Sequence, residues 1–441
     1  MLKKVFIVSL GCPKNLTDAE VMAGRLAAAG FEFTSDETEA DIALINTCAF
    51  LGSAVKESED EIKRLLSLKE RGRIKKVAVT GCLAEREKDR LLRKFPGIDA
   101  VVGINALDLI NSALNGARSC IIPAALPLAA PELKVRLTSP HTAYLKIADG
   151  CDNHCSYCAI PMIRGHFRSK PVADVLTEAA DLSASGAAEI SLIAQDTTSY
   201  GMDIYGRPRL YDLLKKLAAA PGIRWLRLLY VYPEKLSSEI LKLMRDEKTV
   251  CRYLDMPLQH ISDNVLKKMN RRSTELSIRS KLAAIKKFMP DAAVRTNFIV
   301  GFPGETEKDF KKLLKFVKDT GFAGVGVFKY SREPGTSAAG LPDQVPEKIK
   351  TARMNELIDA QSRIIDRLNT SLTGKTVEVL MDSANFGRTY RDAPEIDGKV
   401  EVTAPKLTAA SRRKPAELKA GDFVKVRITG ASGYLRRGTL I

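Results

Sequence analysis

The chain has 441 residues, of which 45% are hydrophobic and 28% are charged, the balance of a soluble globular protein with several domains. A net charge of +16 favours acidic partners, above all RNA or a ribonucleoprotein, although a merely basic soluble protein is the alternative. No apolar run is long enough to span a membrane. The eight cysteines are clustered rather than spread as a disulfide framework. The composition therefore argues against membrane-spanning and disulfide-scaffold proteins and indicates a reducing cytoplasm.

Three apolar, β-branched runs in the first third of the chain each lead into a cysteine. The expected strands and their cysteines are Lys4 to Leu10 with Cys12, Asp41 to Asn46 with Cys48, and Lys76 to Thr80 with Cys82. Helix-like segments separate these runs, so the pattern predicts a parallel α/β sheet. Ligand sites of such sheets lie at the carboxyl ends of strands, so the three thiols are expected to converge in space and to hold an iron–sulfur cluster. Three buried apolar cysteines are the alternative.

A second group of cysteines lies in the stretch from Asp149 to Cys158, with the spacing Cys-x3-Cys-x2-Cys at Cys151, Cys155 and Cys158. Three close thiolates can hold three irons of a cubane iron–sulfur cluster and leave the fourth iron open for a ligand. A zinc loop is the alternative. Structural zinc takes four ligands, and no fourth cysteine follows at zinc-finger spacing, although two histidines are near.

Six apolar runs alternate with helix-like segments around and after this cysteine triplet. The expected strands are Thr142 to Ile147, Glu189 to Ala194, Arg224 to Tyr230, Tyr253 to Met256, Val294 to Val300 and Gly324 to Tyr330. This alternation predicts an open (βα)6 barrel with its active groups on the loops after the strands. His260, which follows the fourth strand, is either a core histidine or an active-site group.

The pattern changes near Ser371, where short strands separated by turns replace the helix-rich pattern. Thr376 to Met381, Gly398 to Val402 and Phe423 to Ile428 predict a small five-stranded barrel of the oligonucleotide-binding type. The complete organisation expected from the sequence is an N-terminal domain over 1–121, a linker over 122–136, a barrel domain over 137–369 and a tail domain over 370–441.

The cysteine triplet, with Tyr157 just before its last thiol, resembles the signature of the radical S-adenosylmethionine (SAM) enzymes. The resemblance implies that the open iron binds SAM, which one electron then cleaves to a 5′-deoxyadenosyl radical. It also implies that Gly301 and Gly304 of the string Gly-Phe-Pro-Gly lie along SAM, with a plain strand-to-helix turn as the alternative. Gln195 and Asp196 occupy the position that holds the amino group of SAM in this superfamily.

The whole chain resembles the methylthiotransferases, which combine a three-cysteine N-terminal domain, a radical-SAM core and a TRAM domain. MiaB-like members modify an adenosine of tRNA, and RimO-like members modify the β-carbon of an aspartate in small-subunit ribosomal protein S-twelve. The strings that resemble the RimO-like branch are Ser9 to Asn15, Ala194 to Thr198 and Asp392 to Gly398. The basic tail is the feature that would suit tRNA instead.

The resemblance implies two [4Fe–4S] clusters, one on each cysteine group, with SAM serving as methyl donor and as radical source. It also implies a sulfur donor, an electron donor and a site of action in the cytoplasm, on or near the ribosome, without membrane attachment. Beyond the cluster ligands, no catalytic residue is assigned. A non-catalytic iron–sulfur or zinc protein that binds ribosomes is the alternative from a different functional class.

Overall fold

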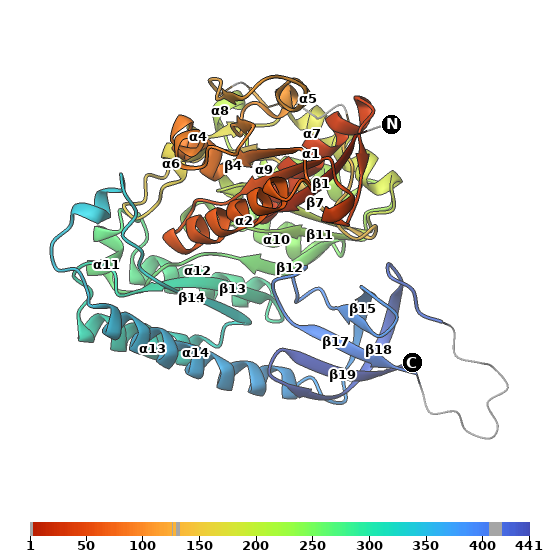
Figure 1. Cartoon of the computed structure of the whole chain (residues 1–441). Coiled ribbons are helices and arrows are strands. Elements are labelled where there is room, and N and C mark those ends of the chain that lie inside the picture. The colour runs from red at the N-terminus through yellow and green to blue at the C-terminus, as the bar shows by residue number, and fades with distance from the viewer. Residues whose placement is uncertain (1–2, 126, 129–132, 405–416) are drawn as a thin grey trace.

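Two open parallel sheets and one small closed barrel follow one another along the chain. The computed structural model describes residues 3–125, 127–128, 133–404 and 417–441. In Figure 1 the N-terminal sheet and its helices lie at the top, the second sheet lies below them, and the closed barrel lies at the lower right. The domain boundaries expected from the sequence stay a prediction, and part of the expected linker lies outside the described residues.

The N-terminal sheet has six parallel strands in the order β2-β1-β3-β4-β5-β6. Its strands are β1 (Lys4–Ser9), β2 (Glu32–Phe33), β3 (Ile42–Thr47), β4 (Lys76–Gly81), β5 (Ala100–Val102) and β6 (Ser119–Ile121). Its helices are α1 (Pro13–Ala28), α2 (Gly52–Glu70), α3 (Cys82–Glu87), α4 (Asp89–Lys94) and α5 (Ile110–Asn115). The parallel α/β sheet is thus confirmed. The sequence analysis missed β2 and β6, because edge strands this short carry no periodic pattern.

The second sheet has six parallel strands in the order β14-β13-β12-β11-β10-β7, and its two edges do not pair with each other. They are β7 (Thr142–Lys146), β10 (Glu189–Ile193), β11 (Trp225–Leu228), β12 (Val250–Asp255), β13 (Ala293–Val300) and β14 (Gly324–Lys329). All six lie where the apolar runs predicted them, so the open six-stranded arrangement is confirmed. A short antiparallel pair, β8 (Ala148–Asp149) with β9 (Arg168–Ser169), flanks the cysteine loop.

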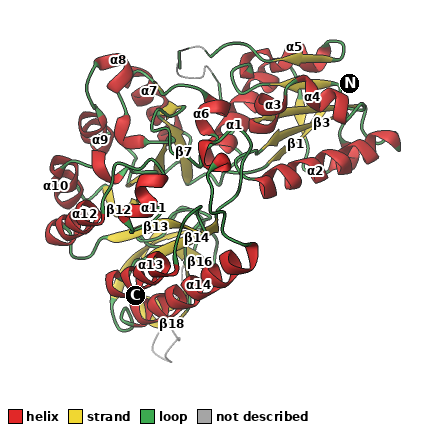
Figure 2. Cartoon of the chain, turned by 90° about the vertical axis from the view of Figure 1, so that its left-hand side faces the viewer, coloured by secondary structure: helices red, strands yellow, loops and turns green. Residues whose placement is uncertain are grey.

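Amphipathic helices cover the outer face of the second sheet. They are α7 (Val172–Ala184), α9 (Leu210–Ala218), α10 (Ser238–Asp246), α11 (Asp263–Lys268), α12 (Glu275–Phe288), α13 (Glu307–Thr320) and α14 (Glu347–Thr370). Two short helices lie elsewhere: α6 (Ile160–Arg164) packs on α3 of the N-terminal domain, and α8 (Met202–Tyr205) contacts β9. In α9 the leucines at 210, 213, 214 and 217 recur at helical spacing and are all buried, which explains how this face joins the core. Figure 2 shows the helices as an outer layer around these strands.

The tail forms a closed barrel in the order β15-β16-β17-β19-β18. Its strands are β15 (Thr376–Met381), β16 (Phe386–Arg388), β17 (Lys399–Thr403), β18 (Phe423–Ser432) and β19 (Leu435–Leu440). Every pair is antiparallel except β17 with β19, so the antiparallel barrel is confirmed with one parallel closure. The long helix α14 runs along the lower edge of the second sheet and leads into this barrel (Figure 1).

Buried polar contacts attach the barrel to the second sheet. Arg388 Nη1 donates to Glu189 at 2.7 Å, and Tyr253 donates its hydroxyl hydrogen to Asp397 at 2.6 Å. The barrel therefore has a defined position relative to the sheet. Within the described part of the chain, no helix is both long and apolar enough to cross a membrane.

Candidate cluster and cofactor sites

Cys12, Cys48 and Cys82 follow the carboxyl ends of β1, β3 and β4, which are neighbours in the N-terminal sheet. The sheet therefore places the three thiols at one edge, although 70 residues of chain separate the first from the last. Gly11 permits a close approach of two of these loops. It has φ +94°, and a Cβ at this position would lie 2.8 Å from Cβ and 3.0 Å from Sγ of Cys48.

Two buried asparagines hold the three strand ends together. Asn15 donates its amide hydrogens to the carbonyl oxygens of Leu10 at 3.0 Å and Thr47 at 2.9 Å, and Asn46 donates to the Asn15 carbonyl at 2.6 Å. Gly81, at φ +89°, makes room for this arrangement, since a Cβ there would lie 2.3 Å from Asn46 Oδ1. The site formed by Cys12, Cys48 and Cys82, here called the convergent site, is thus closely packed, and a side chain at Gly11 or Gly81 would collide with neighbouring atoms.

Burial favours the protonated form of two of these thiols, Cys48 and Cys82. It raises the pKa of Cys82 to about 11, and the neighbouring Cys12 and Cys48 add to the shift while Arg164 opposes it. Burial also raises the pKa of Cys48. A bound metal takes thiolates, so metal loading would release the protons that burial retains. The donor set suits iron, which prefers sulfur ligands of this kind.

The second cysteine group occupies one loop between β8 and α6. Cys151, Cys155 and Cys158 are all half-buried, and the backbone amide of Cys158 donates to the Cys155 carbonyl at 3.0 Å. Gly150 has φ +80°, and a Cβ on it would lie 2.0 Å from the carbonyl oxygen of His166. The loop therefore folds back on the following turn and leaves one side of its thiols open. Burial raises the pKa of Cys158 to about 12.

Among the described residues, no three His, Cys, Asp or Glu side chains are placed to share a single metal ion. A cubane cluster has a different requirement, because each thiolate binds its own iron and the thiols stand apart. His154 and His166 are exposed, and His166 Nδ1 lies 2.9 Å from the Asp152 carboxylate. The two histidines that lie near the triplet in sequence are thus on the surface of the structure.

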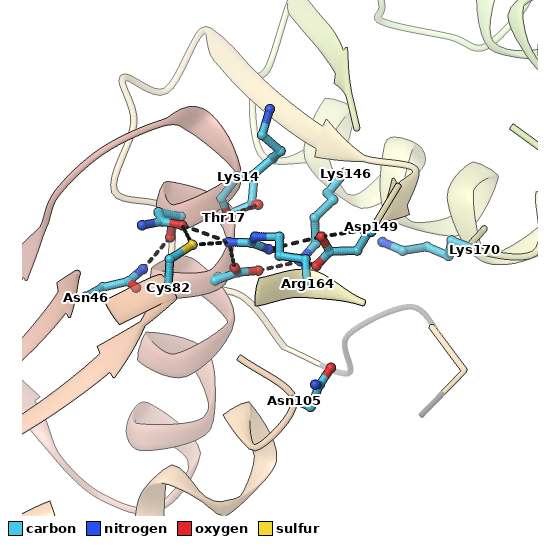
Figure 3. Close-up of polar contacts among 12 residues, drawn as sticks. Lys14, Thr17, Asn46, Cys82, Asn105, Lys146, Asp149, Arg164 and Lys170 are labelled. Carbon is cyan, nitrogen blue, oxygen red and sulfur yellow. Dashed lines mark hydrogen bonds and ion pairs between the residues drawn. The ribbon is translucent and has the colours of Figure 1, made fainter. Parts of the chain in front are cut away.

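Arg164 joins the two cysteine sites through one buried guanidinium (Figure 3). Nη1 donates to both carboxylate oxygens of Asp149, at 3.1 and 2.8 Å. Nη2 donates to Asn15 Oδ1 at 2.7 Å and to Asp18 Oδ2 at 3.0 Å, and it lies 3.5 Å from Cys82 Sγ. Arg164 and Asp149 flank the cysteine loop in sequence, whereas the other three partners belong to the N-terminal domain.

The charges at this junction stabilise one another. Lys146 contacts the carboxylates of both Asp18 and Asp149. Burial by itself would raise the pKa of Asp149, but Arg164 and Lys146 hold it well below its usual range. Burial opposes the charge of Arg164, yet Asp149 and Cys82 keep the pKa of Arg164 above its usual value. Sequence reasoning missed this network, although a charged residue at the end of the apolar helix α6 was a usable signal.

Gln195 and Asp196 lie after β10 and reach the cysteine loop from the second sheet. The Asp196 carboxylate accepts from Asn153 of the cysteine loop at 2.8 Å and from Lys235 at 2.7 Å. Gln195 donates to Asp149 at 2.8 Å, and its Oε1 is buried with no hydrogen-bond partner among the described residues. Asp196 thus orients the loop, while Gln195 retains a free acceptor.

The turn containing Gly301 and Gly304 lies beside the same loop. Both glycines have positive φ, +71° and +74°, which fits close approach of backbone to a ligand or to another segment. Phe302 of this turn contacts the Tyr157 ring edge-on, with 6.5 Å between centroids. The Glu305 carboxylate accepts from the amides of Gly301 and Phe302, which fixes the turn. The structure therefore brings Tyr157, Gly301 and Gly304 to one side of the cysteine loop.

His260 belongs to the core. It is fully buried, and its Nδ1 accepts from the Ser262 amide at 3.0 Å. Its Nε2 lies 3.8 Å from Glu305, which itself holds the glycine turn. Of the two interpretations left open by the sequence, the structure supports the buried histidine.

Three family models match successive parts of the chain. Residues 4–103 match the model described as Uncharacterized protein family UPF0004, residues 145–317 match the Radical SAM superfamily, and residues 373–441 match the TRAM domain. These segments correspond to the N-terminal sheet, the second sheet and the closed barrel. The radical-SAM match includes the cysteine loop, Gln195, Asp196 and the glycine turn.

Curated relatives match the chain from end to end. The ribosomal protein uS12 methylthiotransferase RimO of Elusimicrobium minutum is 50% identical over 440 residues, which is 100% of both chains. The RimO of Geobacter sulfurreducens is 46% identical and covers 100% of this chain and 99% of its own. Among solved structures, the radical SAM methyltransferase TsrM of Kitasatospora setae has a TM-score of 0.55 at 16% identity, covering 77% of each chain, which shows a shared fold. The chain belongs to the RimO family of ribosomal protein uS12 methylthiotransferases.

Proposed function

We propose that this chain transfers a methylthio group to the β-carbon of an aspartate in small-subunit ribosomal protein uS12. The observation that supports this most directly is the junction at Arg164, where a thiol of the convergent site and the loop of the other cysteine group share one buried network. Sulfur insertion needs a radical generator and a sulfur carrier close together. Membership of the RimO family supports the same reaction and the same substrate.

The residues that would hold the cofactors form two groups. Cys151, Cys155 and Cys158 would hold the SAM-binding [4Fe–4S] cluster, and Cys12, Cys48 and Cys82 would hold the second [4Fe–4S] cluster. When bound, these cofactors would supply the radical, the methyl group and a carrier for the sulfur, whereas the electron and the sulfur come from other molecules. Further contacts to SAM are proposed for Tyr157, Gln195, Asp196, Gly301 and Gly304, which surround the cysteine loop.

The chain's own residues contribute position and shielding. Asn15 and Asn46 tie together the strand ends that carry the convergent thiols. Asp196 holds Asn153 and with it the loop of the other cysteine group. Arg164 keeps the two groups at a constant separation by bonding to residues on both sides. A fixed separation matters because reacting atoms must meet within van der Waals contact, and an error of about 1 Å can cost a hundredfold in rate.

The closed barrel is proposed to dock the protein substrate, with the reaction taking place in the cytoplasm on or near the ribosome. A sulfur donor and an electron donor must be supplied by other molecules. The barrel is held rigidly on the second sheet by Arg388 and Tyr253 and could therefore present a substrate in a fixed orientation.

Mass spectrometry of a strain that lacks its own methylthiotransferase tests the proposal. Expression of this chain should restore the methylthio mass shift on ribosomal protein uS12, whereas the Cys155→Ala variant should not. A shift that appears on a tRNA adenosine instead would replace this proposal by the tRNA-modifying alternative. Restoration of neither shift would contradict a methylthiotransferase function.

A further inference from the structure

A buried lysine between the two cysteine sites lacks a carboxylate partner. Lys14 lies two residues after Cys12, at the start of α1, and is 6% exposed. Its Nζ lies 3.2 Å from the centroid of the Tyr230 ring and 3.4 Å from the Ala194 carbonyl oxygen. Among the described residues, no carboxylate oxygen forms an ion pair with it. An ammonium group has three hydrogens to donate, so this one retains bonding capacity.

The carboxylates that act on Lys14 electrostatically are already engaged elsewhere. Burial lowers the pKa of Lys14, and Asp149 and Asp255 oppose that shift. Asp149 is bound by Arg164, and Asp255 is bound by Arg295 at 2.8 Å. A buried charge without a counter-ion is costly, so such a group either gives up its proton or is compensated by a bound anion.

The surroundings of Lys14 have the features of a built binding site. Tyr230 has φ +58°, a strained conformation for a residue with a side chain, and its ring lies against the ammonium. The backbone of Tyr230 is held in place because Thr197 donates to its carbonyl at 3.1 Å. Cys12, Gln195 and Tyr230, which lie beside Lys14, are half-buried. In Figure 3 the Lys14 side chain extends away from the Arg164 network.

We propose that Lys14 binds the side-chain carboxylate of the aspartate that is modified. The inference rests on the proposed function and deepens it by naming a residue that recognises the substrate. In aspartate the β-carbon is bonded directly to the carboxylate carbon. An ammonium that holds the carboxylate therefore places the reacting carbon one bond away from a fixed point. Lys14 follows Cys12 in sequence, so that point lies beside the convergent cysteine site and the ends of β10 and β11.

A binding cycle between enzyme and substrate variants tests this role. The holoenzyme, loaded with both clusters, is titrated with ribosomal protein uS12 and with its aspartate-to-asparagine variant at the modified position. The carboxylate and amide have nearly the same shape, so the ratio of their dissociation constants reports the charge contact. The wild-type enzyme should bind the aspartate form about tenfold or more tightly than the asparagine form. Lys14→Met should bind both forms equally.

Two further variants separate recognition from a structural role. Lys14→Arg keeps the positive charge and should retain a preference for aspartate, whereas Lys63→Met, at an exposed helix position, should leave the wild-type ratio intact. Iron content of Lys14→Met is measured in parallel. A Lys14→Met enzyme that still prefers aspartate, or one that loses the convergent cluster, would overturn the assignment.

The outcome also distinguishes failure of this inference from failure of the proposed function. If the wild-type enzyme binds neither form of uS12 and modifies neither, the proposed function itself is wrong. If it binds and modifies uS12 but does not discriminate between aspartate and asparagine in binding, only the role of Lys14 is wrong.

Discussion

The two cysteine groups each contain three thiols, but the fold brings the thiols of each group together in a different way. Cys151, Cys155 and Cys158 share one loop, and a few turns of backbone position them. Cys12, Cys48 and Cys82 come from three strand ends that only the sheet brings together. The first group, here called the loop group, should therefore keep its geometry when residues elsewhere in the fold are substituted. The second, the convergent group, depends on the contacts that align its strands.

This difference resembles the contrast between local and long-range contacts in folding. A loop of eight residues needs little chain entropy to close, whereas strand ends far apart in sequence are placed only after the sheet has formed. Both groups have a closely packed glycine: a Cβ on Gly81 would lie 2.3 Å from Asn46 Oδ1, and a Cβ on Gly150 would lie 2.0 Å from the His166 carbonyl oxygen. Iron content per site and stability of the metal-free protein are therefore the measurements that test the comparison.

Single substitutions that remove one thiol from either group should have the largest effects on iron content and activity. Reconstituted protein should hold about eight irons, and Cys155→Ala or Cys12→Ala should each reduce this to about four. Deoxyadenosine formation should be abolished in Cys155→Ala and retained in Cys12→Ala, which should nevertheless transfer no methylthio group. Iron analysis and chromatography of the products provide the measurements. Cys120→Ala, which removes a half-buried thiol on β6 outside both groups, is the control. Iron near eight in Cys12→Ala would refute the convergent cluster.

Loss of the buried guanidinium at the junction should come next. Arg164→Gln removes a buried cation that is paired with the carboxylates of Asp149 and Asp18, so the free energy of unfolding should fall by about 3–5 kcal/mol. Urea unfolding of the metal-free protein measures this loss. Arg252→Gln, which breaks an exposed pair with Asp291, should cost less than about 1 kcal/mol. Equal losses in the two variants would show that the junction is not an integral part of the fold.

A substitution that adds a methyl group at the convergent site should affect the two cysteine groups differently. Gly81→Ala places a Cβ 2.3 Å from Asn46 Oδ1 at φ +89°, so unfolding free energy should fall by about 2–3 kcal/mol. The variant should lose the convergent irons and keep those of the loop group, which iron analysis of reconstituted protein can resolve. Gly72→Ala is the matched control, with φ +71° and no atom within 4 Å of the new Cβ. It should cost about 1 kcal/mol and no iron.

The smallest effect should follow from the loss of a helix cap that contains no residue of either cysteine group. Thr306 caps α13 and forms a reciprocal capping box with Asp309. Thr306→Ala should lower the free energy of unfolding by about 1 kcal/mol without changing iron content. Thermal unfolding and iron analysis together provide the measurement. If this variant loses iron as Gly81→Ala does, then general stability, rather than local geometry, would explain the sensitivity of the convergent group.

The regular elements were largely predictable because they depend on patterns within one segment. All six strands of the second sheet and the main strands of the first were located by apolar runs with turn residues at their ends. The two-residue strand Glu32–Phe33 was missed because its pairing with β1, rather than its own composition, makes it a strand. For the same reason the parallel pairing of β17 with β19 could not be read from either strand alone.

In the candidate site, too, some features are set within one segment of the chain and others only by contacts between segments. The spacing of Cys151, Cys155 and Cys158 is a local property, and so is the string that contains Gly301 and Gly304. The contact between Tyr157 and Phe302, which joins these two segments, is a product of the second sheet. The sequence analysis assigned no role to Arg164 or Lys14, because each has contacts in another domain that only the fold reveals.

The amino-acid sequence by itself determined the three-part organisation, the identity of the thiols and the resemblance to methylthiotransferases, since spacing and periodicity are properties of the linear chain. Only the tertiary structure decided that one guanidinium connects the two cysteine groups and that the ammonium of Lys14 is buried without a carboxylate. Burial and pairing depend on which segments meet, and a charge that is ordinary in the sequence becomes informative only when the fold removes it from water.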